Sequence, residues 1–163
     1  MKSLFILLVF IFLYSASFAQ KDYRKFRESL PGLTCGVDTL SIETHLYTID
    51  QLNAHIKTHP DHHGAYYDLG MEYYTVAAKV DSKDSEYWQQ SIQAFEKYIE
   101  HSPGKQKFKG YKNLAVIHGF LGNCDKALLN IALVKSESPN KFKDNTNEDT
   151  EAWIRKKCQA DEG

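Results

Sequence analysis

Histidines in one short stretch are the side chains with the clearest potential for chemistry: His55, His59, His62 and His63. His55 and His59 are four residues apart, so in a helix both lie on the same face. Neutral imidazoles at such spacing can bind zinc or copper. A companion carboxylate is lacking unless Asp61 serves, and Asp61 is also placed to cap the next helix. We therefore predict no metal site and keep metal binding by these histidines as an alternative.

Sequence motifs for catalysis do not support an enzyme. The chain has no nucleophile elbow, phosphate-binding loop, dinucleotide fingerprint or zinc-protease helix. No pair of carboxylates is placed for acid–base work, and no signature supplies a base for Cys35. We therefore predict a protein without catalytic residues and without a cofactor.

Residues 1–19 have the layout of a secretory signal. Lys2 gives a positive start, Leu4 to Tyr14 form an apolar and aromatic run, and Ser17 and Ala19 suit a signal peptidase. The run is short for a membrane-spanning helix, which needs roughly 20 apolar residues. We predict cleavage after Ala19, export to the periplasm or the medium, and no stable membrane insertion afterwards. An uncleaved N-terminal anchor is the alternative.

Charge is almost balanced, with 21 acidic and 20 basic residues in the chain. Nucleic acids and anionic membranes favour a basic excess, so neither is predicted as a general partner. Residues 20–163 have the length of one domain. Ten tyrosines and nine phenylalanines favour large side chains packed between helices.

An internal repeat is the strongest feature of the sequence. Its first element occurs as Tyr66-x2-Leu69-Gly70-x2-Tyr73 and as Tyr111-x2-Leu114-Ala115-x2-His118. Its second element occurs as Ser91-x3-Phe95-x2-Tyr98-x4-Pro103 and as Ala127-x3-Ile131-x2-Val134-x4-Pro139. Both elements have helical spacing, and a proline cannot continue a helix, so each unit reads as two helices that end near a proline.

This pattern resembles the tetratricopeptide repeat, over about residues 48–160. The resemblance implies an all-α fold, a right-handed stack of antiparallel helix pairs with about two and a half repeats and a C-terminal capping helix. Gly70 and Ala115 would let the first helix of each pair, helix A, approach the second, helix B. Ser91 and Ala127 would do the same from the B side.

Three segments depart from the regular repeat. The distance from Gly70 to Ser91 exceeds the distance from Ala115 to Ala127 by nine residues, which we expect in a polar loop around Val80–Glu86. Residues 49–58 are predicted as a lone helix B, opened by a capping box at Thr48. Residues 148–159 are predicted as the capping helix. The N-terminal segment, residues 20–47, has no predicted fold.

The resemblance implies a binding groove on the exposed faces of the A helices. On helical spacing that face carries Tyr67, Met71, Tyr74, Lys109, Lys112, Val116 and Phe120. Aromatic, methionine and lysine side chains suit an extended or helical peptide with some acidic character. Some relatives hold a C-terminal carboxylate with Lys and Asn there, but Tyr67 and Met71 replace the polar residues of the first unit. The alternative is that Tyr67 and Met71 pack against the N-terminal segment or the capping helix.

The implied up-down-up course of the last three helices predicts a disulfide between Cys124 and Cys158. Cys124 opens the last helix B and Cys158 ends the capping helix, so both fall at the same end of the stack. Cys35 is then the odd thiol, either free or paired with another chain.

We therefore predict an exported protein–protein interaction module, an adaptor or assembly factor that binds a protein or peptide partner. A metal-binding protein and a structural protein that self-associates through its end faces are the alternatives. The sequence does not identify the partner or the oligomeric state.

Overall fold

The computed structural model describes residues 23–30, 39–137 and 145–160, and over these residues all regular structure is helical. The elements are α2 (Ile42–Thr58), α3 (His63–Val80), α4 (Glu86–His101), η1 (Gly104–Gln106), α5 (Phe108–Phe120), α6 (Cys124–Glu137) and α8 (Asn145–Ala160). Residues 23–29 form a further short helix. None of the helices in these ranges is long and apolar enough to cross a membrane. The predicted all-α class is confirmed.

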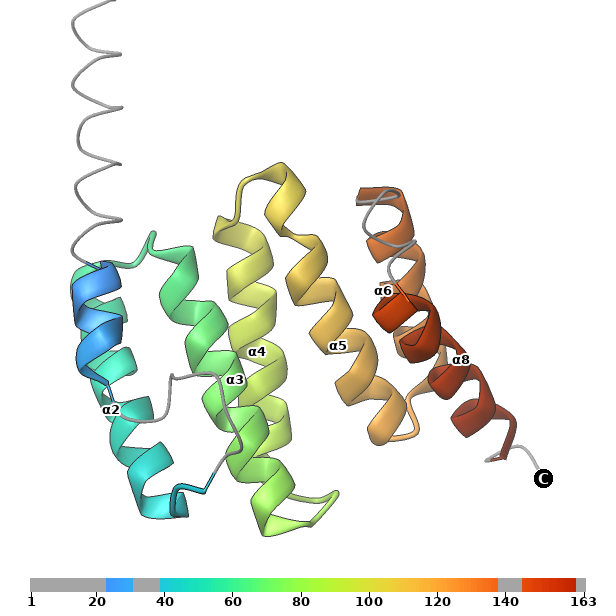
Figure 1. Cartoon of the computed structure of the whole chain (residues 1–163), viewed down its shortest axis with the longest axis horizontal. Coiled ribbons are helices and arrows are strands. Elements are labelled where there is room, and N and C mark those ends of the chain that lie inside the picture. The colour runs from blue at the N-terminus through green and yellow to red at the C-terminus, as the bar shows by residue number, and fades with distance from the viewer. Residues whose placement is uncertain (1–22, 31–38, 138–144, 161–163) are drawn as a thin grey trace, which may run out of the picture.

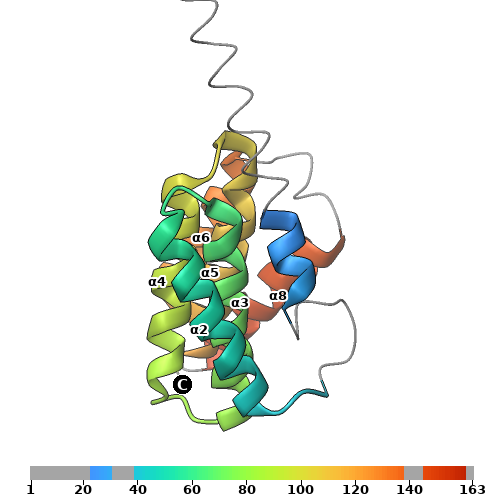
Figure 2. The same cartoon turned by 90° about the vertical axis from the view of Figure 1, so that its left-hand side faces the viewer.

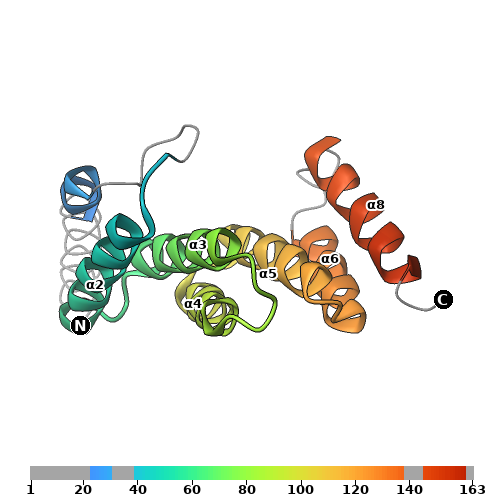
Figure 3. The same ribbon diagram turned by 90° about the horizontal axis from the view of Figure 1, so that it is seen from below.

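Consecutive helices from α2 to α6 run in opposite directions and pack side by side (Figure 1). The closest pairs are α3 with α4 and α5 with α6, and α8 packs on both α5 and α6. The short helix at residues 23–29 and α8 lie at opposite ends of this layer but on the same side of it (Figures 2 and 3). That side is therefore bordered at both ends.

Gly70 brings α3 and α4 together. A Cβ atom at this position would lie 2.9 Å from two ring atoms of Phe95, whose side chain is fully buried. Ser91 is also buried, and its Oγ donates a 2.7 Å hydrogen bond to the carbonyl oxygen of Gly70. The small residues predicted at this interface thus allow close packing of the two backbones.

A polar loop lies at residues 81–85, where it was predicted, but the expectation that it holds all nine extra residues was wrong, because most of them lengthen the helices. α3 continues ten residues beyond Gly70, whereas α5 continues five beyond Ala115. α4 begins five residues before Ser91, whereas α6 begins three before Ala127. The loop gains only the remaining two residues. Val76 and Ala77 in the extension of α3 are fully buried, so packing supports the added turns.

The first long helix begins earlier than predicted. α2 starts at Ile42, after Ser41, whose hydroxyl accepts a hydrogen bond from the backbone N–H of Thr44. The expected capping residue Thr48 is fully buried inside the helix and bonds back to the carbonyl oxygen of Thr44. The predicted start at Thr48 was therefore wrong, because the helix is capped further upstream, at Ser41.

The C-terminal helix closes the end of the layer. Ile154 is fully buried, and a Cβ atom at Gly119 of α5 would lie 3.2 Å from Ile154 Cγ1. Cys124 and Cys158 form a disulfide, with Cα atoms 5.6 Å apart, which ties the start of α6 to the end of α8. The predicted disulfide is confirmed.

Candidate functional site

The seven predicted groove residues lie on α3 and α5, but several of their side chains also pack against the hydrophobic core. Tyr67, Met71, Tyr74 and Phe120 are half-buried and pack against the core cluster around Trp88 and Phe95. Tyr74 meets the ring of Trp88 edge-on at 5.5 Å, and the Phe120 and Trp88 centroids are 4.9 Å apart. Lys112 and Val116 are half-buried, and Lys109 is exposed.

Two contacts join the predicted residues of α3 to α5. Lys109 Nζ lies over the ring of Tyr67, 5.9 Å from its centroid. Asn113, which the sequence analysis did not single out, donates from Nδ2 to Met71 Sδ at 3.8 Å. Asn113 lies one residue after Lys112 and four after Lys109, so helical spacing alone would have included it.

A pocket of about 320 Å³ lies where the N-terminal helical segment, residues 23–30, meets α3 and the start of α5. Two of the predicted groove residues, Tyr67 and Lys109, line this pocket. The other lining residues are Tyr23, Arg27, His63, Gly64, Asp68, Tyr98 and Gln106. Arg27 and Lys109 supply positive charge. Tyr23, Arg27 and Asp68 could not be placed from the sequence, because their contacts span more than forty positions of the chain.

Asp68 holds the N-terminal helical segment in this pocket. Its Oδ2 accepts hydrogen bonds from Tyr23 Oη at 2.6 Å and from Arg27 Nε at 2.7 Å. Tyr23 and Asp68 are buried, and burial together with the neighbouring carboxylate raises the pKa of Tyr23. Tyr23 therefore remains a hydroxyl donor at ordinary pH. The Asp68 carboxylate is balanced by Arg27, which leaves Lys109 as a further positive group.

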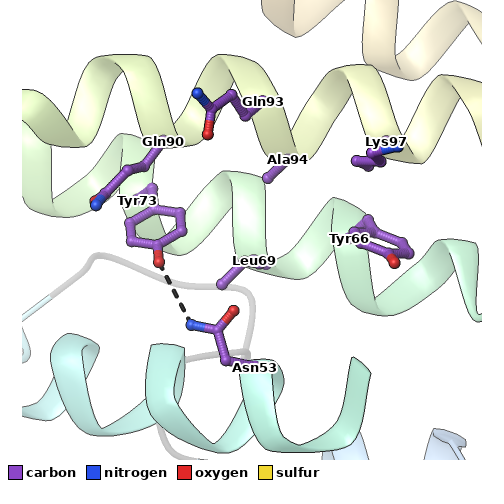
Figure 4. A pocket seen from close by; sticks show the side chains of 8 residues that line it. All are labelled: Asn53, Tyr66, Leu69, Tyr73, Gln90, Gln93, Ala94 and Lys97. Atoms are coloured by element: carbon purple, nitrogen blue, oxygen red, sulfur yellow. Dashed lines mark hydrogen bonds between the residues drawn. The ribbon is translucent and has the colours of Figure 1, made fainter. Parts of the chain in front are cut away.

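Two further hollows lie on the side of α2, α4 and α6, and they are lined by equivalent positions of the sequence repeat. One, of about 280 Å³, lies between α2 and α4 over α3 and is lined by amides and tyrosines, including Asn53, Tyr73 and Gln90 (Figure 4). Asn53 Nδ2 donates to Tyr73 Oη at 3.4 Å. The other, of about 480 Å³, lies between α4 and α6 over α5, with His118 at the position equivalent to Tyr73.

His118 is the one described histidine with a buried ring nitrogen, Nδ1, that makes no hydrogen bond. Its side chain is 6% exposed. Desolvation, followed by the nearby charge of Lys126, lowers the pKa of His118. The imidazole is therefore neutral at pH 7, and protonation is unfavourable where it sits.

The four histidines of the alternative metal-binding hypothesis do not lie together: three are close to one another and the fourth is apart. His55 Nε2 and His62 Nδ1 are 3.0 Å apart, and the His59 ring stacks on His55 at 4.5 Å. His63 points elsewhere, with Nε2 3.2 Å from Gln106 Oε1. Over the described ranges, no group of three or more His, Cys, Asp or Glu side chains is arranged to hold a metal ion. Asp61 is exposed and does not cap α3, which begins after His62.

The predicted signal segment, residues 1–19, and Cys35 lie outside the described residues. No protein-family model matches the chain, and comparisons with curated proteins and with solved structures also find no match.

Proposed function

We propose that the chain is an exported protein–protein interaction module with a tetratricopeptide-like stack of helix pairs. It binds a peptide of acidic character along α3 and α5, between the N-terminal helical segment and α8. The observation that carries this proposal is the pocket in which Arg27 and Lys109 lie with Tyr67, at one end of that surface.

The charge of this surface favours an acidic ligand. Residues 101–124 contain four lysines and no aspartate or glutamate. Lys109 lies over Tyr67, and Lys112 is on the next turn of α5. A peptide carboxylate beside these groups gains charge-assisted hydrogen bonds, and the Tyr67 ring offers an apolar surface next to them.

The borders of this surface favour an elongated ligand. The N-terminal helical segment and α8 both rise on the same side of the layer, with α3 and α5 between them (Figure 3). Trp153 on α8 is 40% exposed, although its ring also reaches Gly119 of α5. An exposed tryptophan at one border and a cationic pocket at the other suit a peptide with an apolar and an acidic end.

The test is selection of peptides from a displayed random library, followed by fluorescence polarisation with the selected peptides. Lys109→Glu together with Lys112→Glu is compared with Lys126→Glu, which changes a lysine of α6 in the hollow between α4 and α6. We expect the selected peptides to be acidic. Their affinity should fall about tenfold in the double variant, because the reversed charges repel the ligand, and it should be unchanged in the control. Equal losses in both variants, or no selected peptides, would refute the proposal.

A further inference from the structure

The N-terminal helical segment rests on a pair of histidines. Phe26 stacks on His55, with ring centroids 4.4 Å apart and planes 14° apart. The Tyr23 ring lies 4.4 Å from that of His62 and 5.3 Å from that of His55. Both aromatic residues that attach the segment to α2 and α3 therefore contact an imidazole.

The two imidazoles are joined directly to each other. His55 Nε2 and His62 Nδ1 are 3.0 Å apart, which requires one N–H donor and one nitrogen lone pair. Two neutral rings meet this requirement, and so does a pair that carries one extra proton. A doubly protonated pair does not, because two N–H groups would then face each other without an acceptor.

The surroundings do not compensate charge on this pair. The ionisable groups nearby are Tyr23 and Arg27 on the segment, His59 on α2, and Asp61, His63 and Asp68 on α3 and its approach. Among these described groups the carboxylates are engaged elsewhere. Asp68 binds Tyr23 and Arg27, and Asp61 is exposed and 3.7 Å from His101 Nδ1.

We propose that the His55–His62 pair makes attachment of the N-terminal helical segment sensitive to acid, and that protonation of the pair releases the segment from α2 and α3. The rings of Tyr23 and Phe26 shield the two imidazoles from water, which disfavours their charged forms, and the His55–His62 hydrogen bond fails when both are charged. The pocket then loses its Tyr23 and Arg27 wall, so that acid weakens ligand binding. This consequence for binding, unlike the release itself, rests on the function proposed above.

The pKa values agree with this geometry. Desolvation, and then the charges of His59 and His62, lower the pKa of His55 to about 4. Desolvation, and then His59 and His63, also lower the pKa of His62. A histidine whose pKa is lowered in the attached state favours attachment above its ordinary pKa near 6.5. That contribution is lost as the pH falls from about 6.5 toward the lowered value.

The experiment is NMR of the purified chain at pH 7.5 and pH 5.0, a window above the ordinary range of carboxyl groups. The ¹⁵N heteronuclear NOE of residues 24–30 reports whether the segment is ordered. We expect the attached-to-released ratio to fall about tenfold or more at pH 5.0, since the rings are partly exposed and the full shift is not realised. The segment of His63→Gln should respond in nearly the same way, because His63 bonds Gln106 and makes only the third-largest contribution to the lowered pKa of His62.

The matched variant is His55→Gln with His62→Asn, whose amides place neutral donors and acceptors near the two ring nitrogens. Its segment should stay ordered at both pH values. A native segment that remains ordered at pH 5.0, or a variant segment that is released as readily as the native one, overturns the proposal.

A second measurement decides the matter if the double variant is already released at pH 7.5. The ring pKa values of His55 and His62 are followed by NMR in the native chain and in Tyr23→Ala with Phe26→Ala. Removal of the aromatic contacts should raise both pKa values toward 6.5, because linkage is reciprocal. Unchanged pKa values would contradict the proposal, whereas loss of peptide binding without segment release would concern only the proposed function.

Discussion

His45 Nδ1 and Glu72 Oε2 lie 2.7 Å apart in the interior, where both side chains are less than 5% exposed. The contact joins α2 to α3, and it brings together an imidazole and a carboxylate that are 27 positions apart. Desolvation of a buried polar pair costs free energy, so the intact pair adds little net stability. Removal of one partner, in contrast, lowers the free energy of unfolding strongly.

Replacing both members of this pair should destabilise the fold less than the two single replacements together. We expect His45→Leu alone to lower the free energy of unfolding by about 3 kcal/mol, because Glu72 loses a buried partner. The double variant His45→Leu, Glu72→Leu should lose less than the sum of the two single variants. Urea denaturation at pH 7 measures all three, with Lys97→Ala as a control that removes an exposed ion pair and should cause no measurable change. Additive losses would show that the two residues are not coupled.

The glycine at the α3–α4 contact should not tolerate a methyl group. We expect Gly70→Ala to lower the free energy of unfolding by about 1–2 kcal/mol, because its Cβ atom would press on the buried Phe95 ring and outweigh the helix propensity of alanine. Gly104→Ala is the control, since a Cβ atom there meets nothing within 4 Å. Chemical denaturation of both variants tests this. A Gly70→Ala protein as stable as Gly104→Ala would mean that Phe95 moves aside easily.

Removal of the disulfide should loosen α8 before the rest of the chain. Cys124→Ser with Cys158→Ser should lower the free energy of unfolding by about 2–4 kcal/mol, since the bond closes a loop with a separation of 34 residues. Hydrogen exchange should rise in α8 and change little in α3 and α4, because the disulfide belongs to the core cluster of α5, α6 and α8. Uniform acceleration across all helices would contradict this local role.

Acid should destabilise the chain partly through His118. Its pKa is lowered in the folded state, so the neutral ring contributes stability above the ordinary histidine pKa, and this contribution is lost as the pH falls below about 6.5. His118→Phe keeps a ring and removes the titration, so the difference in stability between pH 7 and pH 5 should shrink. Denaturation midpoints at both pH values measure this difference, and His63→Gln serves as the control. An unchanged difference in His118→Phe would exclude His118 as a source of the acid sensitivity.

Local sequence patterns were sufficient for several features. Spacing of aliphatic, aromatic and small residues predicted the helices around Gly70 and Ala115, because helix periodicity depends on residues three and four apart. Pro103 follows the last residues of α4, as its chemistry requires. The disulfide could be predicted as well, because the course of three successive helices places Cys124 and Cys158 at one end.

The boundaries of helices were less predictable. Two residues near the start of α2 are suited to capping, Ser41 and Thr48, and sequence alone does not show that Thr48 is fully buried. The polar residues 81–85 do form the loop between α3 and α4, but this loop holds only two of the nine extra residues. The others lengthen α3 and α4, because these two helices pack closely on each other and the packing stabilises the added turns.

The sequence by itself therefore determined the helical class, the close contact at Gly70 and the pairing of Cys124 with Cys158, since these follow from short-range periodicity and chain direction. Only the tertiary structure decided that Tyr23 and Arg27 meet Asp68, and that His55 faces His62 while His63 turns to Gln106. Contacts between residues so far apart in the chain leave no periodic signal, because they depend on how whole helices pack.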